Sequence, residues 1–462
     1  MHKAVLMAAS AAMFAFPVSG RAQDLKGVQG DPRVPALEEQ VRQMQAELAA
    51  LKKGQETRIG LDNGRLTVTS ADGDFSLSLR ALIQYDYGYF AQSRGPAAGP
   101  LADLSSGSNF RRAQIGVAGT AWRDFSYNFT LDFAGNGVEK SGYIYNAYVQ
   151  YDARPFAIRI GAYTPPGGIE DQTGSGDLIF LERPSAVDAA RNLAGSPSRT
   201  AVTLFHGGDT HQFAVSYTGN KVGDSGAFDE QQAVVGRAAW LPLDAANAKW
   251  LLDATFTHVF KPADVAPGAP VSRVSFSAGP ELAVDNNGPR TVDTALSGAF
   301  DAKSVTILGL ESALACETLY FQGGWFRYGV QRRAAAIPDP DFNGWYAAAT
   351  WSLTGEAHPY DAATATFRGL RPRRGLGSGG LGAWEVKARY SHLDLDFDPL
   401  AAPAAGGVAG GVQDVWTLGV NWYVTNGIRL SFEYDNIKVN HIGIPANDVS
   451  ADGFGLRTQL SL

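Results

Sequence analysis

Basic side chains recur at alternate positions of segments whose other face is apolar. Arg159, for example, lies between Ile158 and Ile160. Neighbouring residues of an extended strand point to opposite faces, so the basic residues of each segment share one face. A guanidinium group donates two parallel hydrogen bonds to an oxyanion, which suits it to bind phosphate. The strand residues predicted to contact a solute are Arg80, Arg112, Gln114, Arg159, Arg199, Lys387 and Arg389.

The segments with this alternation are long enough to cross a bilayer. In residues 125–133, aromatic and aliphatic residues alternate with small polar residues, and residues 75–86, 416–424 and 428–435 follow the same period. Tilted strands of about 9–11 residues span a membrane, whereas strands of soluble proteins are usually about 5–6 residues long. Hydrocarbon leaves edge N–H and C=O groups unsatisfied, so such strands must close on themselves. The pattern predicts an all-β fold: a transmembrane antiparallel β-barrel of about 16 strands with a short N-terminal helix.

The two faces of such a barrel differ in what they tolerate. An arginine at the lipid midplane costs about 2–4 kcal/mol, so the basic face is expected to line the lumen. Each basic residue could instead form a structural ion pair with a lumen acid such as Asp132 or Glu385, and that alternative stays open. The Asn426-Gly427 hairpin and the final strand ending at Leu462 predict a C-terminus on the periplasmic side.

Composition and the N-terminus restrict the class of protein. The 462 residues contain no apolar run of 18 or more beyond the N-terminus, which excludes a helical membrane protein. The lone Cys316 excludes an intrachain disulfide and a cysteine-based metal site, and we expect no cofactor. Residues 1–22 have the charge, apolar core and small-residue cleavage site of a signal peptide. Cleavage there removes Lys3 and Arg21 and no acid, which changes the net charge from -7 to -9 and argues against nucleic acid as a partner.

Residues 23–60 are expected to form a periplasmic linker and a short helix, and residues 61–462 the barrel. Between Ala36 and Lys53 the apolar residues are spaced alternately four and three apart, as in a coiled coil. Only about two heptads are present, so an amphipathic helix docked on another surface is an equal alternative. The spaced residues are Leu37, Val41, Met44, Leu48 and Leu51.

Several segments resemble the phosphate-selective porin O and P family. They are Phe110-Arg111-Arg112-Ala113 with Ile115-Gly116-Val117, residues 351–356 with Pro359-Tyr360, residues 382–391 with Leu393-Asp394-Leu395, and Asn421-Trp422-Tyr423. The likeness covers about residues 55–462 in consistent order. It implies a homotrimeric 16-stranded barrel in the outer membrane, surrounded by outer-membrane lipid, that takes up anions such as phosphate or polyphosphate.

The segment Thr164–Ser198 is long and lacks strand alternation. Loops of this length are usually functional or disordered. Its position and the resemblance predict that it folds inward as a constriction, and an external loop folded outward is the alternative. It adds Arg183 and Arg191 to the predicted lining residues. Its five acids, however, oppose a dianion and leave phosphate specificity open. They are Glu170, Asp171, Asp177, Glu182 and Asp188.

Two other classes of function fit a barrel: an enzyme such as a lipase or protease, and a plugged structural barrel or adhesin. The chain lacks G-x-S-x-G and H-E-x-x-H. Ser391, His392 and Asp394 are close in sequence, but neighbouring strand residues alternate faces, so they make a weak catalytic set. The sequence therefore predicts an outer-membrane porin for small solutes that prefers anions, with a general porin as the alternative.

Overall fold

The computed structural model describes residues 33–462 apart from residues 56, 63, 100, 135–141, 224–228, 266–272, 285–288 and 299. The signal peptide expected at residues 1–22 lies outside the described residues. The chain divides into a unit that ends at Glu56 and a unit that spans Thr57–Leu462. In the first unit, helix α1 covers Arg33–Gln55. Its Leu37, Val41 and Met44 are exposed, so the coiled coil stays a prediction.

The second unit is a closed barrel. Sixteen strands of the described residues pair antiparallel with their neighbours, and β23 pairs with β3, which closes the sheet. This confirms the fold predicted from the sequence. The strands are β3 (Ser76–Arg94), β4 (Gly107–Ala121), β5 (Phe125–Asp132), β6 (Tyr143–Ala153), β7 (Phe156–Tyr163), β8 (Arg199–Gly207), β9 (His211–Lys221), β10 (Gln232–Asp244), β11 (Ala248–Lys261), β15 (Phe300–Cys316), β16 (Leu319–Arg332), β17 (Asp341–Ser352), β20 (Ala383–Phe397), β21 (Val408–Tyr423), β22 (Ile428–Asn440) and β23 (Val449–Ser461).

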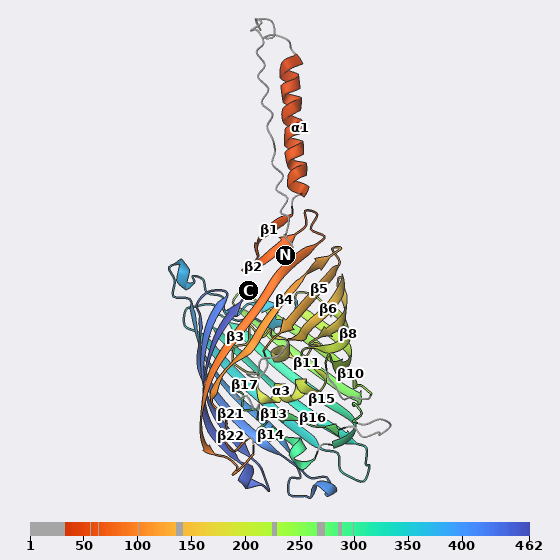
Figure 1. Cartoon of the computed structure of the whole chain (residues 1–462), viewed down its shortest axis with the longest axis vertical. Helices are drawn as coiled ribbons and strands as arrows, with labels where there is room; N and C mark the ends of the chain where they lie inside the picture. Colours follow the sequence, from red (N-terminus) through yellow and green to blue (C-terminus); the bar gives the residue numbers. More distant parts are fainter. Residues whose placement is uncertain are drawn as a thin grey trace, which may run out of the picture. The chain divides into compact units, whose positions relative to one another are not determined.

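Side-chain burial in the barrel is the reverse of that in a soluble protein. On β9, Phe213 and Val215 are exposed, whereas Gln212 and Ser216 on either side of them are buried. The strands tilt around the barrel wall (Figure 1). Five of the eight exposed tryptophans among the described residues lie near the ends of strands or in their turns, as in the aromatic girdles of membrane barrels. They are Trp122, Trp240, Trp250, Trp351 and Trp384.

The two ends of the barrel differ in the length of their connections. At one end the strands are joined by turns such as residues 154–155, 317–318 and 424–427, and β23 also ends there. We call it the short-turn end, and such turns face the periplasm in bacterial barrels. One connection there is long: residues 353–382, between β17 and β20, which we call the long turn. It holds the short strands β18 (Tyr360–Asp361) and β19 (Thr366–Phe367) and the 3-10 helix η2 (Leu376–Ser378). The hairpin of β1 (Arg58–Asp62) and β2 (Arg65–Thr69) precedes β3 and pairs with its start.

The opposite, long-loop end supplies two segments that reach inward. One is loop 164–198, with helices α2 (Ile169–Gln172) and α3 (Ser185–Ala194), and the other is loop 262–299 between β11 and β15. The described parts of loop 262–299 contain β12 (Arg273–Val274), β13 (Ser277–Ala278), β14 (Val292–Asp293) and the 3-10 helix η1 (Thr294–Ser297). The remaining 3-10 helices, η3 (Pro403–Ala405) and η4 (Pro445–Asn447), lie in the other loops of this end.

Loop 164–198 lies inside the barrel. Helix α3 contacts β9, β16, β17 and β20, which stand on different sides of the wall. Glycines on the inner face make room for the loop: a Cβ at Gly344 would lie 2.9 Å from the Cβ of Ala186, and one at Gly455 would lie 2.9 Å from Cδ2 of Leu181. The inward path predicted from the sequence is therefore the observed one, and the outward alternative is excluded.

Candidate functional site

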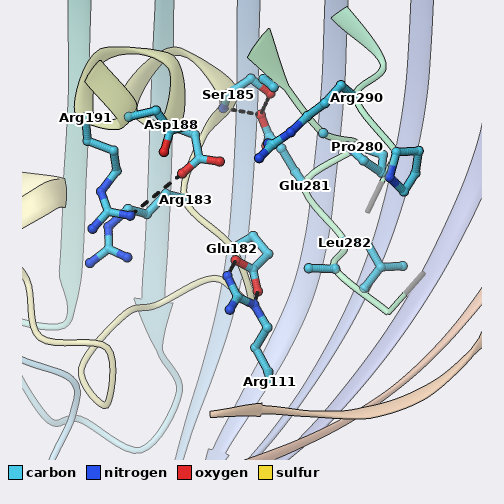
Figure 2. Close-up of a pocket in the computed structure, with 15 residues that line it drawn as sticks. Arg111, Glu182, Arg183, Ser185, Asp188, Arg191, Pro280, Glu281, Leu282 and Arg290 are labelled. Carbon is cyan, nitrogen blue, oxygen red and sulfur yellow. Dashed lines mark hydrogen bonds and ion pairs between the residues drawn. The ribbon is translucent and has the colours of Figure 1, made fainter. Parts of the chain in front are cut away.

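The two larger cavities along loop 164–198 are both lined by two arginines of that loop. The outer cavity, of about 200 Å³, is bounded by loop 164–198, residues 278–283 of loop 262–299 and Arg111 of β4. The inner cavity, of about 570 Å³, is bounded by loop 164–198, the long turn and the walls of β3 to β7. Arg183 and Arg191 line both cavities and so mark the place where the two cavities adjoin, which we call the waist. Figure 2 shows their side chains next to each other.

The two waist arginines are held in different ways. Nε of Arg191 lies 2.5 Å from Oδ1 of Asp171, and its Nη1 lies 4.0 Å from Oδ1 of Asp188. Arg183 instead donates to backbone carbonyls, from Nε to Glu170 at 3.1 Å and from Nη2 to Thr173 at 2.9 Å. Within the described residues, Arg183 has no carboxylate within 4.0 Å. Its charge is therefore only partly offset where the two cavities meet.

The electrostatics of the waist agree with this geometry. Burial, followed by repulsion from Arg191, lowers the pKa of Arg183. Burial also opposes the charge of Arg191, but Asp171 and then Asp188 outweigh it and raise the pKa of Arg191. Arg183 thus lies in a positive potential that an anion would relieve. An anion passing the waist gains an interaction that a cation of the same size does not.

Arginines outnumber acids on the wall of the inner cavity. Two of its acids form ion pairs with arginines: Asp171 pairs with Arg191, and Asp361 accepts a hydrogen bond from Arg368 at 2.6 Å. Asp177 accepts a backbone hydrogen bond from Gly369 at 3.2 Å. The cavity is lined by Arg65, Arg80, Arg159, Arg183, Arg191 and Arg368 against Asp171, Asp177 and Asp361. Its lining therefore carries a positive balance.

The acids of loop 164–198 do not form the repulsive barrier that their number suggested. Glu182, on the wall of the outer cavity, accepts two hydrogen bonds from Arg111 at 2.6 and 2.8 Å. Burial alone would raise the pKa of Glu182, but Arg111, and with it Arg112 and Arg457, holds that pKa well below its usual range. The expectation that these acids oppose an anion was wrong for Glu182, because Arg111 and Arg457 on the barrel wall compensate its charge.

The predicted lining residues fall into two groups. Arg80, Gln114, Arg159, Arg183 and Arg191 line the inner cavity, while the other four line neither of the two cavities. Their part in conduction remains a prediction in both groups. The second group is buried: Arg112 donates to Gln84, Arg199 to the carbonyl of Gly219, Lys387 to Glu433, and Arg389 to Glu281.

Lys387 and Arg389 each form a structural ion pair, the alternative that the sequence left open for the basic residues. Nζ of Lys387 lies 2.6 Å from Oε1 of Glu433, and Nη2 of Arg389 lies 2.7 Å from Oε2 of Glu281. Both also bind carbonyls of loop 164–198, at Ile179 and at Glu182 respectively. These two residues therefore fasten the inserted loop to β20 of the barrel wall.

Sequence reasoning missed Arg111 because of a β-bulge. The pairing of β3 with β4 shifts between Gln84 with Arg112 and Tyr85 with Phe110, so that Arg111 is the extra residue. A bulge sets two adjacent residues opposite one. Arg111 and Arg112 therefore both contact inner-face or loop residues, although strict alternation separates them. Two consecutive arginines in an amphipathic strand were the available signal.

The long turn is fastened in the lumen through His358. Its Nε2 lies 2.6 Å from Oε1 of Glu385, and its Nδ1 lies 2.8 Å from the carbonyl oxygen of Arg368. Burial lowers the pKa of His358, but Glu385 outweighs burial and raises it overall. The ring of Tyr320 stacks against it at 4.6 Å between centroids.

We expect this attachment to weaken as the pH rises. A raised folded-state pKa means that the stabilisation is complete below the ordinary histidine pKa and is lost as the pH rises through the raised value. Recordings between acidic and alkaline pH should show more current fluctuation at alkaline pH, because the long turn lies along the inner cavity. His358→Phe should remove this pH dependence, and His206→Phe, at a turn outside the lumen, should preserve it. Equal pH dependence in both variants contradicts the role of His358.

The arrangement gives no support to an enzyme. Ser391 donates to Glu281 on the inner side, while His392 contacts Asp414 at 2.9 Å on the other face of β20. The described part of the chain holds no group of three His, Cys, Asp or Glu residues placed to bind a metal ion. Among the described helices, none is both long and apolar enough to cross a membrane.

Comparison with known proteins assigns the family. Residues 75–462 match the family "Phosphate-selective porin O and P". The chain belongs to this family. Porin O of Pseudomonas aeruginosa is 26% identical over 414 residues, which cover 86% of this chain and 90% of that protein. An uncharacterized protein of Caulobacter vibrioides is 26% identical over 379 residues, or 78% of this chain and 68% of that one.

A solved structure with a TM-score above 0.5 shares the fold of this porin. A loop L8 deletion mutant of OmpT of Vibrio cholerae superposes with a TM-score of 0.51 at 10% identity, covering 84% of this chain and 100% of that one. An anion-selective porin from Comamonas acidovorans gives a TM-score of 0.49 at 12% identity, with coverages of 84% and 100%. The chain is thus an outer-membrane porin, as predicted from its alternating strands.

Proposed function

We propose that this porin mediates the passive diffusion of small anions across the outer membrane. The observation that carries the proposal is the waist, where Arg183 and Arg191 line both cavities. The excess of arginine along the inner cavity extends the positive potential toward the short-turn end. Rings of arginine or lysine favour anions in pores.

Phosphate is the solute that we propose the channel favours. The family is described as phosphate-selective, and the P. aeruginosa relative is named Porin O. The guanidinium groups of Arg80 and Arg159 line the inner cavity, and their fork geometry suits phosphate oxygens. The general porin, without preference for phosphate, is the alternative that a competition experiment tests.

The test of anion preference is the reversal potential of the purified protein in a planar bilayer. Under a KCl gradient we expect the current to reverse at a voltage that corresponds to chloride permeating more readily than potassium. Added inorganic phosphate should then reduce the chloride current in a saturable way. A reversal potential that favours potassium contradicts the anion channel, and an absence of conductance steps supports a plugged barrel.

We also propose a homotrimer embedded in outer-membrane lipid, and a mature chain that begins after Ala22 with residues 23–60 on the periplasmic side. The family resemblance supports the trimer, and the composition of residues 1–22 supports the cleavage. Mass measurement of the detergent-solubilised protein tests the first. The N-terminal sequence of the mature protein tests the second.

A further inference from the structure

We propose that Glu182 is a tethered internal anion: its carboxylate occupies a cage of three arginines beside the outer cavity that would otherwise bind a free oxyanion such as phosphate. The inference rests on the proposed function, because it identifies the residue that keeps anion binding weak along the path. The cage consists of Arg111, Arg112 and Arg457.

The contacts of Glu182 are those of a bound oxyanion. Arg111 donates from Nε to Oε1 at 2.6 Å and from Nη2 to Oε2 at 2.8 Å, which is the two-bond geometry that guanidinium forms with carboxylate or phosphate. Nη2 of Arg457 approaches Oε1 at 3.2 Å. Arg112, held by Gln84 at 2.6 Å, adds a third charge without a carboxylate partner among the described residues.

The arginines of the cage carry more positive charge than Asp86 and Glu182 together neutralise. Asp86 neutralises one arginine by accepting from Nε and Nη2 of Arg457 at 2.7 and 2.6 Å. Three guanidinium groups against the carboxylates of Asp86 and Glu182 leave one net positive charge. Without Glu182 the cage carries two, which equals and opposes the charge of a phosphate dianion. The cage therefore suits a doubly charged oxyanion better than chloride.

The cage is open to a permeating solute. Arg111 and Glu182 both line the outer cavity, with side chains 22% and 12% exposed. Figure 2 shows the two side chains facing each other at the edge of that cavity. Glu182 directly precedes Arg183 of the waist, so an anion held in the cage would lie next to the waist. Such an anion would reduce the current of the others.

A carboxylate on the protein competes with solutes at a high effective concentration. A tethered group is present at about millimolar levels or above even on a flexible linker, and Glu182 is fixed in its site. A free phosphate must displace it and leave it buried without its arginine partners. The wild-type channel should therefore bind phosphate weakly at this point and release it quickly.

The decisive experiment titrates inorganic phosphate against the chloride conductance of the Glu182→Ala channel in a planar bilayer. Hydrogen bonds to charged groups contribute about 1.5–3 kcal/mol, so we expect the half-blocking phosphate concentration to fall by about tenfold or more. Asp341→Ala is the matched control, because it removes the same charge while its side chain, 36% exposed, pairs with Arg327 and lines neither cavity. It should shift the block by less than about threefold.

Two further variants keep the test decisive. Adding Arg111→Gln to Glu182→Ala should return the block to the wild-type concentration. If Glu182→Ala does not assemble, Glu182→Gln retains the size of the side chain and a hydrogen bond from Arg111, and we expect an intermediate gain. Equal shifts in the Glu182 and Asp341 variants, or no gain in any Glu182 variant, overturn the cage. The wild-type reversal potential, recorded on the same channels, decides the anion preference independently.

Discussion

Replacing both waist arginines, Arg183→Gln with Arg191→Gln, is expected to abolish the anion preference of the channel. Each guanidinium lines both cavities, so every permeating ion passes within a short distance of it. At about 8 Å and an effective dielectric constant of about 20, one charge attracts an anion or repels a cation by about 2 kcal/mol, so the two ions differ by about 4 kcal/mol. The chloride-to-potassium permeability ratio should fall by about tenfold or more for the pair.

The measurement is the reversal potential under a KCl gradient, compared with that of Arg327→Gln. Arg327 carries the same charge, but it is 56% exposed and pairs with Asp341 near the end of β16. That control should keep the wild-type ratio. An unchanged ratio in the waist variant shows that selectivity resides elsewhere, and a similar fall in both variants assigns it to the net charge of the protein. Arg191 also pairs with Asp171, so its replacement can disturb loop 164–198. A lower conductance with an unchanged permeability ratio would indicate that this loop has collapsed into the lumen.

The barrel was predictable from the sequence because contact with lipid imposes a local alternation of apolar and polar residues on each strand. Every lipid-facing position must be apolar and every second residue faces lipid, so Phe213 and Val215 on β9 carry the signal without knowledge of any partner strand. The pairing of successive strands then follows from antiparallel connection. Closure needs no further information, because an open edge is not tolerated in hydrocarbon.

The side-chain contacts in the lumen could not be predicted in the same way, because they join residues that are far apart in the sequence. Glu281 of loop 262–299 accepts hydrogen bonds from Ser185 of loop 164–198, Ser391 of β20 and Arg389, and no local pattern relates these four residues. Arg80 and Arg159 lie on a cavity while Lys387 and Arg389 are buried in ion pairs, although all four satisfy the same alternation. Which lumen arginine reaches the solute depends on where the inserted loops lie. Strand period carries no information about that.

The second large effect is on stability: Lys387→Met should destabilise the folded barrel by about 3–5 kcal/mol, the cost of leaving a buried charge without its partner. Lys387 and Glu433 both have fully buried side chains, 2.6 Å apart. Nζ of Lys387 also donates to the carbonyl of Ile179 and to Asn421, both at 2.8 Å, so the substitution releases loop 164–198 from β20 as well. The urea midpoint of unfolding in detergent micelles, followed by tryptophan fluorescence, measures the change.

Two variants distinguish a lost ion pair from a general effect of removing lysine. Lys261→Met breaks an exposed pair with Asp229, in which the side chains are 40% and 63% exposed, and pairs of that kind contribute little to stability because solvent screens them. Adding Glu433→Gln to Lys387→Met removes the orphaned charge while an amide oxygen can still accept from the backbone N–H of Leu181. The double variant should therefore regain most of the lost stability, because the uncompensated carboxylate, rather than the absent hydrogen bonds, dominates the cost. If the double variant is no more stable than Lys387→Met, the anchoring of loop 164–198 by the lysine is the larger contribution, and the burial of Glu433 alone does not explain the effect.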